Sequence, residues 1–226
     1  MAYKKLLLDV DGTLLDFDAS AARSLEILFE RRNYPYDKNV FPLYEKINQS
    51  LWERYERGEL PRERVLVDRF DMLFEELGIR ESGEAFENDF REALENNPIW
   101  MSGAEEILEY LYPKYDMYIV TNGVASTQRK RLAATGLNNY VKEVFISEII
   151  GAQKPQKAFF DHCIEHIGSC DLREILLIGD SLSADIRGAN MAGIPSCWFN
   201  PHGKPLSGPA KPDMVIRSLE ELREIL

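Results

Sequence analysis

The sequence lacks any long hydrophobic segment. None of the apolar runs in its 226 residues approaches the 18 residues that a membrane-spanning helix needs. The first apolar run, residues 6–8, is too short for a secretory signal and is followed at once by an aspartate. Cysteine is also scarce, with three residues and no C-x-x-C pair. These absences predict a protein of a reducing, cytoplasmic compartment.

Basic residues are outnumbered by acidic ones. The chain has 27 lysines and arginines against 38 aspartates and glutamates, which gives a net charge of −11. This balance argues against nucleic acid or an anionic membrane as a partner. A small anionic substrate is still compatible, because one bound cation or lysine reverses the local field. The glycine-rich G-x-G-x-x-G and P-loop signatures are absent as well.

Short apolar runs alternate with helical patterns along most of the chain. We expect strands at residues 4–10, 117–122, 144–147, 175–180, 195–199 and 213–216. Helical patterns separate them at residues 104–112, 125–135, 156–167, 183–192 and 218–225. This alternation predicts an α/β protein with a parallel, Rossmann-like sheet that helices cover on both faces.

One block interrupts the alternation. Residues 16–98 contain no convincing strand and read as four helices, at about 18–33, 40–57, 62–77 and 83–96. We therefore expect a helical cap at residues 16–98, inserted into an α/β core formed by residues 1–15 and 99–226.

Polar side chains follow four of the predicted strands. They are Asp9 and Asp11; Thr121 and Asn122; Lys154; and Asp180, Ser181 and Asp185. Each of them alone would be an ordinary turn or helix-capping residue. Because the carboxyl ends of parallel strands meet at one edge of a sheet, the four groups together predict a single site.

The segments around these residues carry a family resemblance. "DVDGTL" (9–14), "TNG" (121–123), "QKP" (153–155) and "GDSLSAD" (179–185) resemble, in order, the four motifs of the haloacid dehalogenase superfamily. The helical insertion is similar to the superfamily's first class of cap. The second acid, Asp11, is one that dehalogenases lack, so the resemblance favours phosphomonoester chemistry over carbon–halogen cleavage.

The resemblance implies an aspartyl-phosphate mechanism. Asp9 is implied to attack phosphorus. Asp11 lies two residues later, where a strand returns its side chain to the same face, and is implied to protonate the leaving oxygen and then deprotonate water. Thr121 and the adjacent Asn122 are implied to bind phosphate oxygens, and Lys154 to neutralise the nucleophile and the transferred group.

The same resemblance implies Mg²⁺ as the cofactor. A hard cation with oxygen ligands offsets the repulsion between an anionic nucleophile and a phosphate ester. The implied ligands are the Asp9 carboxylate, the Asp11 backbone carbonyl and Asp180. Asp185 and Ser181 are expected behind them, where they would orient a bound water or a neighbouring group.

A closer resemblance narrows the substrate. "INQSLWERYERGEL" (47–60) and "FISEIIGAQKPQKAFFD" (145–161) look like the noncanonical pyrimidine nucleotidase branch, which removes the 5′-phosphate of nucleoside monophosphates. Asn48 and Trp52 are then the candidates for contacting the base. Their spacing, shared with Tyr44 and Tyr55, is more often that of the cap's own hydrophobic core, and Asn48 leaves a substrate role open because it makes this face less uniformly apolar.

Other functions stay open at this point. A sugar-phosphate phosphatase or a phosphomutase would use the same core residues. A non-enzymatic phospho-aspartate switch also combines acids, threonine and lysine, but receiver domains of that kind are shorter and have no large cap. The sequence does not indicate an oligomeric state.

Overall fold

The computed structural model describes residues 3–168 and 171–226. They divide into two compact units: residues up to 16 together with those from 99 onward form the core unit, and Phe17–Pro98 form the helical unit. Cys170 lies outside the described residues. None of the described helices is long and apolar enough to cross a bilayer.

The core unit is built on a parallel sheet, so the predicted α/β class is confirmed. Its strands are β1 (Lys5–Leu8), β2 (Asp116–Thr121), β3 (Glu143–Ile146), β4 (Ile175–Gly179), β5 (Ser196–Phe199) and β6 (Met214–Ile216). Their order is β3-β2-β1-β4-β5-β6, and every neighbouring pair is parallel. All six lie within two residues of the predicted strands.

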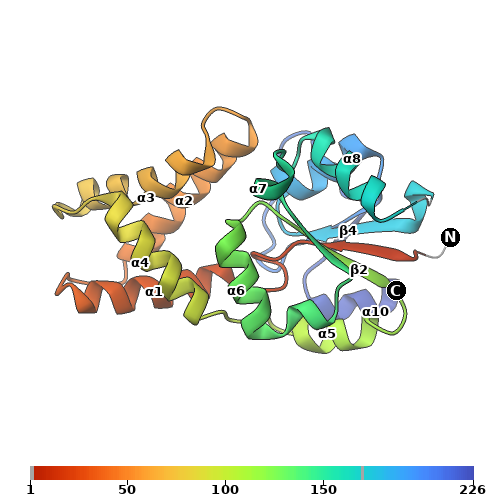
Figure 1. Ribbon diagram of the computed structural model, residues 1–226, viewed down its shortest axis with the longest axis horizontal. Helices are drawn as coiled ribbons and strands as arrows, with labels where there is room; N and C mark the ends of the chain where they lie inside the picture. Colours follow the sequence, from red (N-terminus) through yellow and green to blue (C-terminus); the bar gives the residue numbers. More distant parts are fainter. Residues whose placement is uncertain (1–2, 169–170) are drawn as a thin grey trace. The chain divides into compact units, whose positions relative to one another are not determined.

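Helices cover both faces of the sheet. Those of the core unit are α5 (Ala104–Leu111), α6 (Ala125–Thr135), α7 (Ser147–Ile150), α8 (Lys157–His166), α9 (Arg187–Ala192) and α10 (Leu222–Ile225). Figure 1 shows α8 on one side of the strands and α5 with α10 on the other. Side chains alternate along β1 accordingly: Leu6 and Leu8 pack in one buried cluster and Leu7 in another.

The winding of the sheet reverses next to β1. The chain runs outward from β1 to β2 and β3, and then returns to place β4 on the other side of β1. Ligands of open α/β sheets bind beyond the carboxyl ends of the strands at such a switch point. Asp9 follows β1 there, and its backbone N–H donates to the Ile178 carbonyl of β4 at 3.0 Å. Asp180 follows β4 at the same edge.

Two local elements differ from the sequence prediction. The helix expected at residues 183–192 begins as a π-helical segment, η3 (Leu182–Ile186), before α9 continues it. Such segments occur often at functional sites, and this one holds Asp185. The short helix α7 follows β3 where we expected strand residue Ser147, and it ends at Gly151, which has φ of 78°.

The helical unit contains α1 (Phe17–Arg31), α2 (Val40–Glu56), α3 (Arg62–Leu77) and α4 (Gly83–Asn96). Their apolar faces form one buried cluster with many aromatic rings; Phe70 and Phe86, for example, have ring centroids 4.8 Å apart. The helix α3 ends at Gly78, whose φ of 67° suits glycine. Ser82 caps α4 by accepting a hydrogen bond from the Ala85 N–H.

The segment that leaves the core unit and the segment that re-enters it are joined by backbone hydrogen bonds. The Asp16 N–H donates to the Ile99 carbonyl at 2.9 Å, and the Met101 N–H donates to the Leu14 carbonyl at 2.9 Å. The two connections to the helical unit therefore start side by side.

Candidate active site

A buried aspartate and a buried lysine form the centre of the site. Asp9 is 6% exposed and Lys154 is 2% exposed. The Lys154 Nζ donates to Asp9 Oδ1 at 2.7 Å and to Asp185 Oδ1 at 2.7 Å, and its third hydrogen bond goes to the Val120 carbonyl at 2.9 Å. The ammonium group thus has all three protons engaged, which fixes its position between two carboxylates.

The predicted substrate-binding residue Asn122 holds the lysine's backbone. Its side-chain amide donates to the Lys154 carbonyl at 2.9 Å and accepts from the Lys154 N–H at 2.9 Å. The amide oxygen and one amide N–H are therefore used to hold Lys154, and the second N–H and the backbone of Asn122 remain for a phosphate oxygen.

Asp180 completes an acidic cluster with Asp9 and Asp185. One carboxylate oxygen from each lies within 4.8 Å of the others. Among the described residues, no hydrogen bond reaches the Asp180 carboxylate, whereas its backbone carbonyl accepts from Trp198 Nε1 at 2.8 Å. Gly12 makes room for it, since a Cβ at Gly12 would lie 2.6 Å from Asp180 Oδ2.

This donor set fits a hard divalent cation. Three carboxylates supply only oxygen ligands, as Mg²⁺ prefers, and one lysine cannot balance their charge. Both oxygens of Asp185 accept hydrogen bonds, from Lys154 and from the Ser181 N–H at 3.1 Å. Both oxygens of Asp9 do so as well, from Lys154 at 2.7 Å and from the Thr13 hydroxyl at 3.1 Å. Among the described residues, Asp180 is therefore the member of the cluster whose carboxylate oxygens are most available to a cation.

The crowding of carboxylates shows in their proton affinities. Burial, with the nearby charge of Asp185, raises the pKa of Asp9 to about 7 against the opposing effect of Lys154. Burial and the charges of Asp9 and Asp185 also raise the pKa of Asp180 well above its usual range. Without a cation, the cluster consequently retains a proton near neutral pH.

The carboxylate of Asp11 is held by two residues of α6. Its Oδ1 accepts from Arg131 Nη1 at 2.5 Å and its Oδ2 accepts from Gln128 Nε2 at 2.7 Å. The Thr121 hydroxyl accepts from the same Gln128 Nε2 at 2.7 Å and from the Gly123 N–H at 3.0 Å. Thr121 therefore keeps its own proton to donate.

Comparison with known proteins is consistent with this geometry. The model of the haloacid dehalogenase-like hydrolases matches residues 6–199, a span that includes all of these side chains. The chain belongs to this family. Its members among curated proteins include HAD-hydrolase YfnB of Bacillus subtilis, 42% identical over 99% of this chain and 95% of the relative.

Other haloacid dehalogenase-like relatives are named for nucleotide hydrolysis. Pyrimidine 5′-nucleotidase PynA of Streptococcus pneumoniae is 35% identical over 100% of this chain and 96% of its own length. Pyrimidine 5′-nucleotidase YjjG of Escherichia coli is 31% identical over 100% of this chain and 99% of its own length. A crystal structure of YfnB bound to magnesium, which reveals interdomain movement, has a TM-score of 0.95 and covers 100% of this chain and 99% of that one.

The two predicted base-contacting residues lie together on α2. Asn48 and Trp52 are half-buried, and Trp52 Nε1 donates to Asn48 Oδ1 at 3.1 Å. The same oxygen accepts from the buried Arg69 Nη1 at 3.0 Å. Tyr44 and Tyr55, which share their helix spacing, are buried in the helical unit's core.

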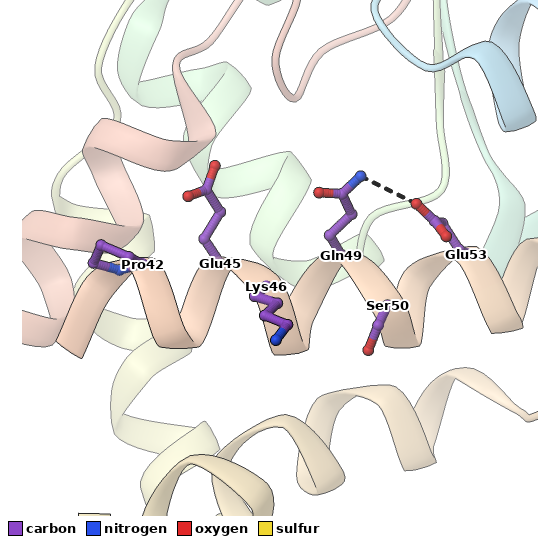
Figure 2. A pocket seen from close by; sticks show the side chains of 6 residues that line it. All are labelled: Pro42, Glu45, Lys46, Gln49, Ser50 and Glu53. Atoms are coloured by element: carbon purple, nitrogen blue, oxygen red, sulfur yellow. Dashed lines mark hydrogen bonds between the residues drawn. The ribbon is translucent and has the colours of Figure 1, made fainter. Parts of the chain in front are cut away.

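A separate hollow on α2 carries none of this chemistry. It is lined by Pro42, Glu45, Lys46, Gln49, Ser50 and Glu53, and Figure 2 shows Gln49 donating to Glu53, at 3.0 Å. Neither Asn48 nor Trp52 is among its lining residues, so it is not the predicted base site.

Our sequence analysis gave no role to Gln128 and Arg131. They lie three residues apart on α6, directly after the TNG segment, and spacing of this kind puts two side chains on one helix face. The available signal was a pair of long polar residues on one helix face, one turn beyond the strand end that the sequence predicts to bind phosphate.

Proposed function

We propose that this hydrolase is a Mg²⁺-dependent phosphomonoesterase that acts on pyrimidine nucleoside 5′-monophosphates. The observation that carries the proposal is the buried Asp9 carboxylate, which contacts Lys154 at 2.7 Å at the switch point of the sheet. The names of the relatives PynA and YjjG support the substrate class.

In the first step, a carboxylate oxygen of Asp9 forms a bond to phosphorus and the bond from phosphorus to the ester oxygen breaks. Asp11 gives its proton to that leaving oxygen. Lys154 offsets negative charge beside the nucleophile, and the Thr121 hydroxyl donates to a phosphate oxygen. Mg²⁺, held by Asp9, the Asp11 backbone carbonyl and Asp180, would supply further charge neutralisation when bound.

In the second step, water attacks phosphorus of the aspartyl-phosphate. The carboxylate of Asp11 takes the water proton, and the bond between phosphorus and Asp9 breaks. Inorganic phosphate leaves, and both aspartates return to their starting states.

We assign recognition of the base to Asn48 and Trp52. The Asn48 carbonyl oxygen accepts from Arg69 and Trp52, which have only donors to offer, so the amide cannot be reversed. Its N–H₂ group is therefore left to donate to an acceptor, such as the ring carbonyls that every pyrimidine nucleotide carries. Trp52 supplies a flat apolar surface for the ring.

A phosphate-release screen with Mg²⁺ tests the proposal. We expect dUMP, dTMP or UMP to have a higher kcat/KM than ribose 5-phosphate, glucose phosphates or AMP. Trp52→Ala should raise KM for the nucleotide about tenfold and leave p-nitrophenyl phosphate, which has no base, nearly unchanged. If sugar phosphates are the best substrates, the nucleotidase assignment is wrong and the phosphatase assignment stands.

A further inference from the structure

One helix holds both oxygens of the Asp11 carboxylate. Arg131 Nη1 donates to Asp11 Oδ1 at 2.5 Å and to Gln128 Oε1 at 3.0 Å, and Gln128 Nε2 donates to Asp11 Oδ2 at 2.7 Å. The plane and direction of the carboxyl group are thus set by two residues of α6.

The stability of the fold does not account for Arg131. The side chain is 2% exposed, yet its Nε and Nη2 have no hydrogen-bond partner among the described residues. Buried donors without partners cost stability. Asp11 is 27% exposed on its side chain, so water could solvate it if the arginine were absent. Arg131 gives a defined position to Asp11, and Asp11 is part of the proposed chemistry.

Gln128 ties Asp11 to the phosphate-binding segment. Its Nε2 also donates to Thr121 Oγ1 at 2.7 Å. Gly123 leaves the space for this amide, because a Cβ there would lie 2.7 Å from Gln128 Nε2. A continuous set of hydrogen bonds therefore runs from Thr121 through Gln128 to Asp11 and Arg131.

We infer that Arg131 and Gln128 are positioning residues that aim the carboxyl group of Asp11 at the leaving oxygen. The inference rests on the proposed function, in which Asp11 is the proton donor. A carboxyl oxygen that accepts one hydrogen bond from α6 can still donate its proton to the substrate. Fixing the orientation before the reaction removes a cost that a freely rotating side chain would meet in the transition state.

The test compares two substrates of similar shape that differ in their need for protonation. Phenyl phosphate releases a poor leaving group, whereas p-nitrophenyl phosphate releases one that needs little help from an acid. Arg131→Met should lower kcat/KM for phenyl phosphate by ~10- to 100-fold and for p-nitrophenyl phosphate by no more than about threefold. Arg129→Met, the same change at an exposed position of α6, should leave both unchanged.

Two further variants separate positioning from folding. Arg131→Met should change the melting temperature little, because it removes two unpartnered buried donors but also the donor to Gln128 Oε1. Arg131→Lys should recover part of the activity on phenyl phosphate. The double variant that combines Arg131→Met with Asp11→Asn should be no slower on phenyl phosphate than Asp11→Asn alone. Both substitutions disable the same proton transfer, from Asp11 to the leaving oxygen.

The outcomes distinguish this inference from the function on which it rests. If Asp11→Asn lowers kcat/KM, which reports the first step, equally for both substrates, the proposed role of Asp11 as proton donor is wrong. Suppose instead that Asp11→Asn lowers kcat/KM for phenyl phosphate more than for p-nitrophenyl phosphate. The inference is then overturned if Arg131→Met lowers kcat/KM equally for both substrates, or if the double variant is slower than Asp11→Asn alone, because Arg131 does not position the acid.

Discussion

The two units of the molecule bury charge in opposite ways. In the helical unit, Arg69 donates through Nε and Nη2 to Glu87 Oε2, at 3.2 and 2.6 Å, and the two charges cancel. Tyr44 and Asn48 accept from Arg69 Nη1 at 3.0 Å each, so every nitrogen of the guanidinium has a partner.

The core unit leaves its buried charge unbalanced. In the described part of the chain, Asp9 and Asp185 share Lys154 and no ion pair reaches Asp180, so the cluster with its lysine keeps two negative charges when fully ionised. A matched pair can serve the fold, because it needs nothing from outside. An unmatched cluster is stable only with protons or a bound cation, which is what a site for Mg²⁺ and phosphate requires.

The largest expected effect comes from removing the proposed nucleophile. Asp9→Asn should reduce turnover by roughly 10⁴-fold or more, because it removes the attacking oxygen and a metal ligand together. The melting temperature of the metal-free variant should be equal to or higher than that of the wild type, since one of three crowded charges is gone. Calorimetry and phosphate release measure the two effects. A folded variant with substantial turnover would contradict the assignment of Asp9.

Removing a charge from the matched pair of Arg69 and Glu87 should lower stability, whereas removing Asp9 from the acidic cluster should not. Glu87→Gln leaves the Arg69 charge buried without a counter-charge and should lower the free energy of unfolding by roughly 3–5 kcal/mol. Urea denaturation measures the change. Glu84→Gln, at an exposed position of the same helix, is the control and should change stability by less than about 0.5 kcal/mol. Equal effects of the two substitutions would show that the buried pair contributes no more to the free energy of unfolding than an exposed glutamate does.

A smaller effect is expected when pH and Mg²⁺ are varied. The pKa of Asp9 is raised from 3.8 to about 7, and that of Asp180 is raised as well, so the metal-free folded protein binds more protons than the unfolded chain in this range. Metal-free stability should therefore fall as pH rises from about 4 to 7.

Mg²⁺ should remove this pH dependence. At about 100 times its Kd, the ion should add ~2.7 kcal/mol at pH 7 and less at pH 5, where it competes with protons. Thermal unfolding at both pH values, with EDTA or with Mg²⁺, measures the difference. A Mg²⁺ effect that grows toward acid pH would be incompatible with a carboxylate site.

The architecture of the core unit could be predicted from the sequence because local signals agreed. Strand residues such as Leu6–Leu8 are continuously apolar, and Asp9 and Asp180 each follow a strand end directly. The motif order also placed Asp9, Lys154, Asp180 and Asp185 at one edge, and the structure brings these four together.

The residues that the sequence did not assign act through long side chains from another element. Nothing local to Gln128 or Arg131 indicates that they reach a turn more than 100 positions earlier in the chain. The same holds for Arg69, whose three partners lie on α2 and α4. Contacts of this kind depend on tertiary packing, which periodicity and motif spacing do not encode.

One measurement tests the central claim, a covalent phosphoryl group on Asp9, most directly. Asp11→Asn should still release p-nitrophenol in the first step, because that leaving group needs little protonation, but should react slowly with water in the second. Rapid mixing with Mg²⁺ and p-nitrophenyl phosphate should then give a burst of one p-nitrophenol per active site. Mass spectrometry of the acid-quenched protein should find the phosphoryl group on Asp9. Steady hydrolysis without a burst or a phosphorylated protein, or a phosphoryl group on another residue, would contradict the account.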